Sequence, residues 1–338
     1  MRTVVCQDSG KMIMLKRDAP TTFGEKDILI RVKRIGICGT DLHAYGGNQP
    51  FFNYPRILGH ELSGIVESVG ENVQTLDIGD QVTVIPYMHC GECVACKNGK
   101  TNCCTKMQVI GVHIDGGMTE YLVLPESHIL KVNELSLNAA AIIEPLSIGA
   151  HAVRRAQIQK GESILIIGAG PIGLGVARFA KLQGAKTIMM DISKERLAFS
   201  REWTGCDRVL VAANDVDLVK ELMNINNGYL PTIVMDATGN KQSMMNAFNY
   251  VSHGGKLIYV GLVKDHISFN DPDFHAKELT LMGSRNATLD DFNYVIDSIT
   301  QGNVDIDSYI TTKISFENVP DYFQAKMYNT NKVLIELD

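Results

Sequence analysis

The fold is decided by a stretch in which an apolar strand runs into a glycine-rich turn, Ser163-Ile164-Leu165-Ile166-Ile167-Gly168-Ala169-Gly170-Pro171-Ile172-Gly173. Gly168 permits a tight turn, Gly170 lets the backbone approach a pyrophosphate, and Gly173 lets the following helix pack closely on the strand. Pro171 and Ile172 open that helix, whose positive end would bind the pyrophosphate. A glycine-rich turn without a ligand is the alternative, but the strand–turn–helix context favours a dinucleotide site.

The second part of such a site is an acid about 20 residues further on. Asp191 occupies this position, directly after an apolar strand that ends at Met190. Its carboxylate would bind ribose hydroxyls and repel a 2′-phosphate, so the sequence predicts NAD rather than NADP. Arg196 could hold such a phosphate, but Asp191 lies at the strand end itself. We also expect Val260 and Leu262, at the end of a later strand, to contact the cofactor.

From Lys160 onward, strands alternate with helices. Apolar strands are predicted at 163–167, 186–190, 232–235 and 256–260, and helices at 172–183, 194–204 and 241–251. Apolar strands that are separated by helices indicate a parallel sheet covered on both faces. The sequence therefore predicts a doubly wound α/β domain over residues 148–284.

The residues before this domain are rich in β-branched side chains and in glycine. Short strands at 28–32, 63–70 and 80–86 are bounded by Gly and Pro, as in a twisted, barrel-like β fold. We expect Glu144-Pro145-Leu146 to form a turn where this domain, 1–147, ends. After Gly283 the alternation fades. A helix at 290–300 and a strand at 333–337 are expected to return residues 285–338 to the first domain.

The composition excludes several classes of protein. With 338 residues, 45% of them hydrophobic, the chain is long enough for two packed domains. A net charge of −6 argues against a nucleic-acid partner, because phosphate binding needs a concentrated basic surface. There is no run of about 18 apolar residues and no signal-peptide core at the N-terminus. The sequence predicts a cytoplasmic protein with no membrane and no nucleic-acid partner.

Five of the eight cysteines are close together, which favours a metal site over a disulfide framework. The spacing offers four thiolates within one lobe, residues 88–106: Cys90-x-x-Cys93-x-x-Cys96 and then Cys104. Four sulfurs close a tetrahedral zinc site with no open position, so we expect a structural zinc. An iron–sulfur cluster is an alternative, and Cys103 could replace Cys104 as the fourth ligand.

A second set of metal-binding residue types is spread along the first domain. Cys38 follows Gly36-Ile37, and His60 and Glu61 follow Gly59. A catalytic zinc takes three protein ligands and leaves one position for water or substrate. Cys38 and His60 supply a thiolate and an imidazole, while Glu61 and Glu144 are carboxylate candidates.

Together these segments resemble the zinc-containing medium-chain dehydrogenase superfamily over essentially the whole chain. They occur in the family's order: Gly36-Ile37-Cys38-Gly39-Thr40-Asp41, Gly59-His60-Glu61, the four-cysteine lobe, Asp115-Gly116-Gly117-Met118-Thr119-Glu120-Tyr121 and the glycine-rich turn. The resemblance implies an α/β protein with a GroES-like β-rich catalytic domain and a Rossmann cofactor domain. Ile143-Glu144-Pro145-Leu146-Ser147 is similar to the sorbitol dehydrogenase-like branch, which carries Glu where alcohol dehydrogenases carry a zinc-binding Cys.

The resemblance also implies which residues bind metal, with one catalytic and one structural zinc per chain. Cys38, His60 and Glu61 would hold the catalytic zinc. Glu144 would bind it directly or through its water. Asp41 resembles the acid that orients the zinc-binding imidazole and fixes its tautomer.

Further residues resemble the parts of the family that handle the substrate. Thr40 and His43 resemble a proton relay, which passes the proton of the substrate hydroxyl through the cofactor ribose to solvent while hydride goes to NAD. Arg285 lies where sorbitol dehydrogenases place an Arg near the substrate, and its planar fork suits a carboxylate or a pair of hydroxyls. The stretch Gly283-Ser284-Arg285-Asn286-Ala287 is similar to bacterial hexonate 5-dehydrogenases for galactonate, idonate or gulonate. We therefore expect oxidation of a secondary hydroxyl of a sugar acid or polyol.

Two other functions stay open. Gly39-Thr40-Asp41-Leu42-His43 resembles threonine 3-dehydrogenase, although Glu144-Pro145-Leu146-Ser147-Ile148 departs from the Glu-Pro-Leu-Gly-Asn of that family. A non-catalytic binding protein on the same fold should have lost zinc ligands, and none is missing here. The resemblance further implies a homo-oligomer, a tetramer or dimer, formed through an edge strand of the cofactor domain at 256–260 or a neighbouring strand.

Overall fold

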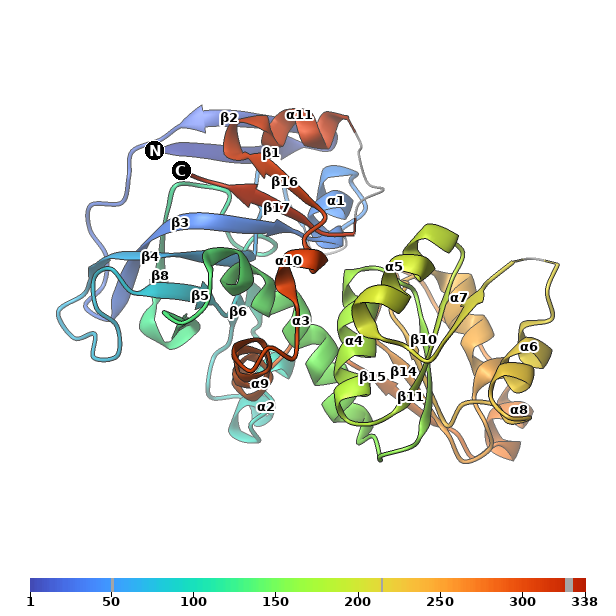
Figure 1. The fold of residues 1–338 in the computed structure, drawn as a ribbon. Coiled ribbons are helices and arrows are strands. Elements are labelled where there is room, and N and C mark those ends of the chain that lie inside the picture. The colour runs from blue at the N-terminus through green and yellow to red at the C-terminus, as the bar shows by residue number, and fades with distance from the viewer. Residues whose placement is uncertain (50–51, 214, 326–330) are drawn as a thin grey trace. The chain divides into compact units, whose positions relative to one another are not determined.

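The computed structural model describes residues 1–49, 52–213, 215–325 and 331–338, which fold as two compact units. The first unit comprises Met1–Pro145 and Thr288–Asp338, and the second comprises Leu146–Ala287 (Figure 1). The sequence analysis predicts these borders after residues 147 and 284. Each unit has a main sheet of its own, and the expected α/β class, with a β-rich domain and a parallel-sheet domain, is confirmed.

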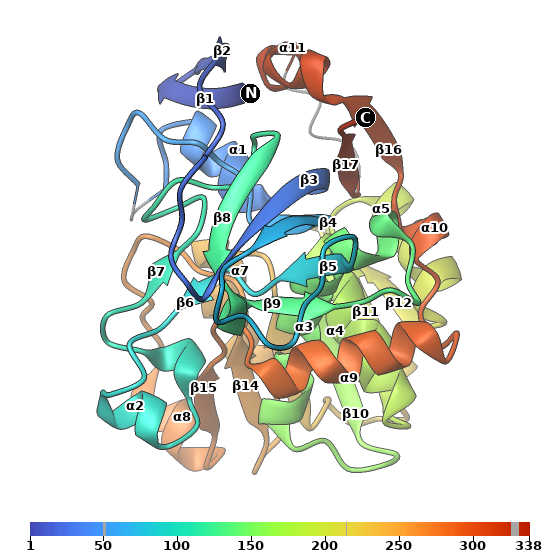
Figure 2. The ribbon, with the colours of Figure 1, turned by 90° about the vertical axis from the view of Figure 1, so that its left-hand side faces the viewer.

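A seven-stranded sheet forms the centre of the first unit, counted over the described residues. Its strands pair in the order β16-β17-β3-β4-β5-β9, and β8 also pairs with β3. They are β3 (Asp27–Ile37), β4 (Glu61–Val69), β5 (Gln81–Val84), β8 (Tyr121–Pro125), β9 (Ile129–Lys131), β16 (Thr312–Ser315) and β17 (Val333–Glu336). Separate antiparallel pairs are β1 (Arg2–Asp8) with β2 (Lys11–Lys16) and β6 (Tyr87–Met88) with β7 (Gln108–Val109). Figure 2 shows β17 beside β3, where Val333 pairs with Ile37.

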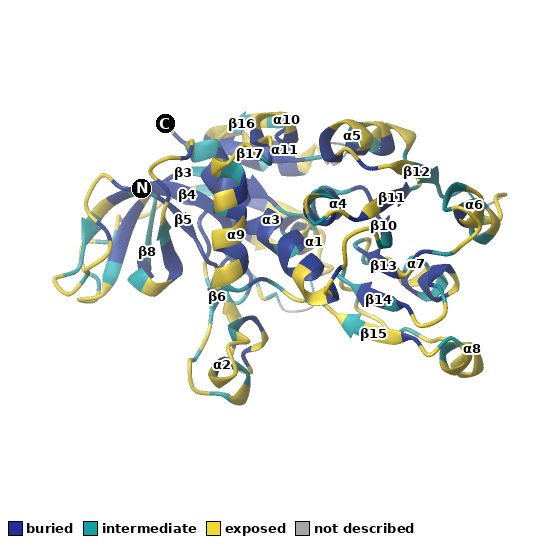
Figure 3. Cartoon of the chain, turned by 60° about the horizontal axis from the view of Figure 1, so that its bottom comes forward, coloured by how far each residue is buried: buried dark blue, intermediate teal, exposed yellow. Residues whose placement is uncertain are grey.

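Short helices connect the strands of the first unit. They are α1 (Gly39–Tyr45), α2 (Val94–Lys97), α9 (Leu289–Thr300), α10 (Ile306–Tyr309) and α11 (Val319–Gln324), with the 3-10 turns η1 (Thr101–Cys103), η2 (Glu126–His128) and η4 (Phe316–Asn318). The strands expected at 28–32, 63–70, 80–86 and 333–337 correspond to β3, β4, β5 and β17. The expected helix at 290–300 is α9, in which Phe292 and Val295 are buried and Asn293 is exposed. Figure 3 shows buried and exposed stretches along α9.

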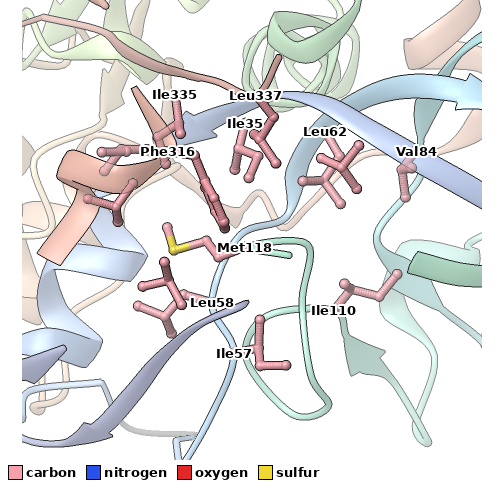
Figure 4. Packing of buried hydrophobic residues seen from close by; sticks show 14 of the residues in the cluster. Ile35, Ile57, Leu58, Leu62, Val84, Ile110, Met118, Phe316, Ile335 and Leu337 are labelled. Carbon is pink, nitrogen blue, oxygen red and sulfur yellow. The ribbon is translucent and has the colours of Figure 1, made fainter. Parts of the chain in front are cut away.

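The hydrophobic core of the first unit packs against its sheet. Figure 4 shows Ile35, Leu62 and Val84, from three neighbouring strands, together with Met118 and Phe316. Each of these side chains is at most 2% exposed. Full burial of such a side chain contributes about 1.5–3 kcal/mol. This core fixes the place where β3 ends and β4 begins.

Glu144-Pro145-Leu146 is not the expected turn but part of the helix α3 (Leu137–Ala156). A proline inside a helix lacks one N–H donor and crowds the carbonyl group four residues earlier. Residues 139–147 are all buried, so the packing of an apolar helix outweighs this local cost. The border between the two units therefore lies within a helix. None of the described helices, α3 included, is long and apolar enough to cross a membrane.

A six-stranded parallel sheet forms the centre of the second unit in the part of the chain that the structure describes. Its order is β12-β11-β10-β13-β14-β15, with β10 (Ser163–Ile167), β11 (Lys186–Asp191), β12 (Arg208–Val211), β13 (Ile233–Asp236), β14 (Lys256–Tyr259) and β15 (Thr280–Gly283). The connecting helices are α4 (Pro171–Leu182), α5 (Lys194–Thr204), α6 (Leu218–Ile225), α7 (Lys241–Asn246), η3 (Ala247–Tyr250) and α8 (Asp271–Ala276). The strand order reverses between β10 and β13, and ligands bind at the carboxyl ends of strands at such a switch point.

The prediction places the edge of the parallel sheet at the strand 256–260 or at a neighbouring strand. β14 pairs with both β13 and β15, so the edges are β12 and β15, and β15 is the neighbour of β14. No range is predicted for β12 or β15. The helix expected at 241–251 ends earlier, at Asn246, and continues as the 3-10 turn η3.

Candidate active site and metal centres

The end of β3 and the start of β4 bring together three residues of the types that bind metals. Cys38 follows β3 directly and caps α1, His60 precedes β4, and Glu61 is the first residue of β4. The two strands are antiparallel and Glu61 lies opposite Gly36. One ligand atom of each of the three residues lies within 4.8 Å of the others. We call Cys38, His60 and Glu61 the mixed-ligand cluster.

Asp41 faces the imidazole of this cluster. Its carboxylate is fully buried and lies 3.8 Å from His60 Nδ1. The backbone N–H groups of Cys38 and Gly59 donate hydrogen bonds to it at 2.9 Å and 3.4 Å. Burial raises the pKa of Asp41. Burial lowers the pKa of His60, but the charges of Asp41 and Cys38 together raise it well above its ordinary value. The buried surroundings of the mixed-ligand cluster, called the pocket below, therefore favour a positive charge.

Several buried polar atoms in this pocket lack a hydrogen-bond partner among the described residues. They are His60 Nδ1, Glu61 Oε1 and Glu144 Oε2. The other carboxylate oxygen of Glu61, Oε2, forms an ion pair with Lys332. An unsatisfied buried polar atom costs about 1–3 kcal/mol, and thiolate, imidazole and carboxylate are the groups that bind zinc. The donor set and its burial therefore fit a zinc ion.

Glu144 approaches the pocket from α3 but is held by another residue. The hydroxyl of Tyr87 donates a hydrogen bond to Glu144 Oε1. Burial raises the pKa of Glu144 to about 7. Glu144 acts on His60 through its charge, yet the group of ligand atoms within 4.8 Å contains Glu61 and not Glu144. The geometry thus favours Glu61 as the carboxylate closest to a metal.

Three buried residues of the pocket were missed in the sequence analysis: Tyr87, Tyr309 and Lys332. Lys332 forms an ion pair with Glu61. Burial, followed by the charges of Glu61 and Cys38, raises the pKa of Tyr309 well above its ordinary value. Tyr309 and Lys332 lie far from the motifs in sequence. Tyr87 directly precedes the four-cysteine lobe, but it belongs to no spacing pattern of metal ligands.

Thr40 and His43 lie on α1, next to the mixed-ligand cluster. The Cys38 sulfur accepts a hydrogen bond from the Thr40 backbone N–H at 3.4 Å. Residues three apart share one face of a helix. Thr40 is half-buried and His43 is exposed. This arrangement leads from the pocket towards solvent, as a proton path requires.

The four-cysteine lobe forms a second cluster, in which ligand atoms of Cys90, Cys93, Cys96 and Cys104 all lie within 4.8 Å. The sulfur of Cys93 lies 3.5 Å from that of Cys96, and the sulfur of Cys104 lies 3.5 Å from that of Cys90. All eight cysteines of the chain are free thiols, so a disulfide framework is excluded. Cys104 is buried and belongs to the cluster, whereas Cys103 is exposed and does not.

Backbone amides lower the pKa of two of these thiols. The amide of Cys96 lowers the pKa of the Cys93 thiol to about 5. The amide of Cys90, which donates to the Cys104 sulfur at 3.3 Å, lowers the pKa of that thiol. Burial raises the pKa of Cys96 to about 12. Four sulfurs around one point, two of them with a lowered pKa, fit a closed zinc site.

The glycine-rich turn of the second unit has the expected geometry. Gly168 has a φ of +99°, which only glycine adopts readily. Gly170 caps α4, and Pro171 and Ile172 form its first turn. A methyl group at Gly173 would overlap the carbonyl oxygen of Gly168. The N-terminus of α4 is therefore open to a phosphate group.

Asp191 ends β11 and links this turn to the next one. Its carboxylate accepts hydrogen bonds from the backbone N–H groups of Ala169 at 2.7 Å and Ser193 at 2.9 Å. An ionised carboxylate has about four acceptor positions, so it can still bind hydroxyls. Arg196 is half-buried on the first turn of α5.

The remaining residues that were expected at the site lie in the loops after two strands. Val260 directly follows β14 and is half-buried, and Leu262 is 68% exposed. Arg285 follows β15 by two residues and is exposed. All three therefore lie at the carboxyl ends of parallel strands, where this class of sheet binds ligands.

Comparison with known families supports the same conclusion. A model described as the alcohol dehydrogenase GroES-like domain matches residues 24–134, and a model described as zinc-binding dehydrogenase matches residues 171–301. The chain belongs to the zinc-binding alcohol dehydrogenase family. The predicted superfamily and the predicted class of enzyme are thus confirmed.

This zinc-binding dehydrogenase is 44% identical over 334 residues to L-galactonate-5-dehydrogenase of Escherichia coli, covering 99% of this chain and 97% of the relative. Among solved structures, it resembles an Escherichia coli alcohol dehydrogenase complexed with NADH, with a TM-score of 0.92, 31% identity and coverage of 100% and 99%. A zinc-binding dehydrogenase of Sinorhizobium meliloti bound to NADP is also similar, with a TM-score of 0.92, 26% identity and 99% coverage of both chains. These relatives place the dehydrogenase in the sorbitol dehydrogenase-like branch that the sequence analysis predicts.

Proposed function

We propose that this dehydrogenase oxidises a secondary hydroxyl of a sugar acid to the ketone, with NAD as the hydride acceptor. The substrate class is a hexonate such as L-galactonate, L-idonate or L-gulonate. The observation that carries the proposal is the 44% identity to L-galactonate-5-dehydrogenase along 99% of the chain. The mixed-ligand cluster supports it, because such a cluster suits a zinc ion that takes part in the reaction.

In this proposal Cys38, His60 and Glu61 would hold the catalytic zinc, and Glu144 would bind it directly or through water. The zinc supplies Lewis acidity, which makes the substrate hydroxyl easier to deprotonate. Asp41 holds the imidazole of His60 in one tautomer. The sulfurs of the four-cysteine lobe hold the structural zinc.

Thr40 and His43 receive the hydroxyl proton and pass it to solvent. His43 is suited to this task because an imidazole can both accept and donate a proton through its two ring nitrogens. Its exposure supports the role, since a relay must end at water. Arg285 binds the carboxylate of the sugar acid through its planar guanidinium group.

Asp191 is the residue that favours NAD over NADP. Its carboxylate lies at the end of β11 and would repel a 2′-phosphate. Of the two solved relatives that contain a nicotinamide cofactor, the one with NADH has the higher sequence identity to this chain, 31% against 26%. The glycines 168, 170 and 173, with Pro171 and Ile172, cradle the pyrophosphate, and Val260 and Leu262 line the remainder of the cofactor.

We also propose that the enzyme is a cytoplasmic homo-oligomer, a dimer or tetramer that associates through the edge of its parallel sheet. The strand proposed to form this contact is β15, because β14 is paired on both sides and β15 is the edge strand beside it. An unpaired edge strand offers free backbone groups to a second copy.

The test is a substrate panel read by NADH formation. L-galactonate, L-idonate and L-gulonate are compared with hexitols and with threonine, each with NAD and with NADP. We expect kcat/KM to be highest for a hexonate with NAD. Preferred turnover of threonine would make the chain a threonine 3-dehydrogenase, and the absence of any turnover would favour a binding protein.

A further inference from the structure

Lys332 is the only buried lysine or arginine among the described residues, at 1% exposure. Lysine is almost never fully buried unless it is paired. Its ammonium group forms an ion pair with Glu61 Oε2 and donates a hydrogen bond to the Ile37 carbonyl oxygen at 3.1 Å. A cation has therefore been placed beside the carboxylate of the mixed-ligand cluster.

The backbone of Lys332 is fixed on both sides. Its N–H group donates to Thr311 Oγ1 at 3.1 Å, and its carbonyl oxygen accepts from the Thr311 N–H group at 2.9 Å. The next residue, Val333, begins β17 and pairs with Ile37 at the end of β3. The side chain thus reaches the corner where Cys38 and Glu61 meet.

The neighbouring strand β3 also determines where the Glu61 carboxylate can lie. Gly36 lies opposite Glu61 in the sheet, and a methyl group there would overlap the Glu61 carboxylate. The missing side chain lets the carboxylate turn across the strand towards Lys332. The other oxygen of Glu61, Oε1, has no hydrogen-bond partner in the described part of the chain. Glu61 is the residue that completes the mixed-ligand cluster with Cys38 and His60.

The geometry points to Lys332 as a positioning residue that holds Glu61 Oε2 back from the catalytic metal and so keeps one coordination position open. This inference rests on the proposed function, in which Cys38, His60 and Glu61 face a zinc ion. With Lys332 present, Glu61 offers at most one oxygen. Without it, both oxygens turn to the metal and close the position that water or substrate needs.

A purely structural ion pair would behave differently. A pair that only anchors β17 should, when broken, destabilise the unit and weaken metal binding. The positioning role predicts the opposite change in metal affinity. When the pair is broken, the metal should bind more tightly, because a freed carboxylate is a better ligand. The two roles are therefore separated by metal affinity and coordination number, neither of which requires substrate.

The test uses the full-length enzyme with Lys332→Met, which removes the charge and keeps an unbranched chain. Lys131→Met is the matched control, because Lys131 pairs with the buried carboxylate of Asp80 at 2.8 Å in the same unit, away from the cluster. The catalytic zinc is replaced by cobalt(II), whose visible absorption weakens as its coordination number rises above four. Metal affinity is measured by competition with a chelator.

We expect Lys332→Met to weaken the cobalt bands and to bind the metal more tightly, because a second carboxylate oxygen becomes available. We also expect it to lower kcat by about 10–100-fold. Lys131→Met should change none of these. In a Glu61→Gln background, Lys332→Met should leave the cobalt spectrum unchanged, because the two residues act through one carboxylate. Unchanged bands in Lys332→Met alone, weaker metal binding, or an effect that survives Glu61→Gln would overturn the inference.

If Lys332→Met does not fold, Lys332→Gln serves with the same readouts, since its amide can still donate to the Ile37 carbonyl oxygen. Failure of the proposed function has a different signature, because a hexonate would then not be the preferred substrate in the panel, whatever the cobalt spectrum of Lys332→Met. If Cys38→Ser lost no metal, the metal assignment on which the inference rests would be wrong.

Discussion

The four-cysteine lobe and the mixed-ligand cluster both gather metal ligands, but they are built differently. The lobe draws four sulfurs from a single segment between Cys90 and Cys104, and the backbone N–H groups of Cys90 and Lys106 donate to the Cys104 sulfur. The mixed-ligand cluster joins the ends of two strands and is surrounded by the buried charges of Asp41 and Lys332. A site that only holds a metal can be completed locally, whereas a site that uses the metal needs charged neighbours from distant segments.

The comparison is tested most strongly by Cys38→Ser, which removes the sulfur of the mixed-ligand cluster and leaves the lobe intact. Metal activation is worth several kcal/mol in the transition state, so we expect turnover to fall by about three orders of magnitude. One zinc equivalent should be lost, while NAD binding and the melting temperature stay near those of the wild type. Metal analysis, kinetics and thermal denaturation measure these effects. Turnover within tenfold of wild type would contradict the assignment.

The reverse change is Cys96→Ser, in the lobe. Structural zinc sites contribute about 10 kcal/mol or more to the folding of small domains, and this lobe should lose part of that stabilisation. We expect one zinc equivalent to be lost, a lower melting temperature, and faster proteolysis within residues 88–106. The activity of the molecules that remain folded should stay within about tenfold of wild type, because the lobe does not touch the reacting groups. A protease-resistant lobe without zinc would show that the metal is dispensable there.

A smaller effect is expected for Asp41→Asn. The amide keeps the size of the carboxylate and can still accept from the Cys38 N–H group, but it removes the charge that faces His60. Loss of such an orienting group typically costs about 10–100-fold in activity or metal affinity. Asp80→Asn is the control, since Asp80 is also buried and paired but lies outside the cluster. Equal losses in the two variants would argue for a general effect on folding.

The smallest effect is expected for Cys103→Ser. Cys103 is exposed and lies outside the sulfur cluster, although its neighbour Cys104 belongs to it. A surface change of this kind usually alters stability by no more than about 0.5 kcal/mol. Zinc content, activity and melting temperature should all match the wild type. Loss of a zinc equivalent would identify Cys103 as the fourth ligand instead of Cys104.

The same contrast explains what sequence reasoning could find. The lobe and the glycine-rich turn are recognisable because their residues are close in sequence and their spacing reflects local geometry. Lys332 and Tyr87 are not, because only the pairing of β17 with β3 and the packing of α3 bring them to the pocket. A lysine before a strand is ordinarily a surface residue, so its burial has no sequence signal.

The errors of the prediction have physical causes of the same kind. Pro145 indicates a helix border, yet the buried surface of α3 outweighs that local preference. The sequence leaves the edge strand open between β14 and a neighbour, because only Leu281 and Met282 are apolar in β15. In both cases tertiary packing decides, and local pattern cannot report it.

The ion pair between Glu61 and Lys332 has a consequence for how the enzyme is made. Ribosomes add about 5–20 residues per second, so the lysine is synthesised roughly a quarter of a minute to a minute after the glutamate. During that interval the whole second unit, Leu146–Ala287, is produced and can fold. The nascent chain therefore carries its metal-binding side chains before their counter-charge exists, and a metal captured co-translationally would meet Glu61 without its restraint.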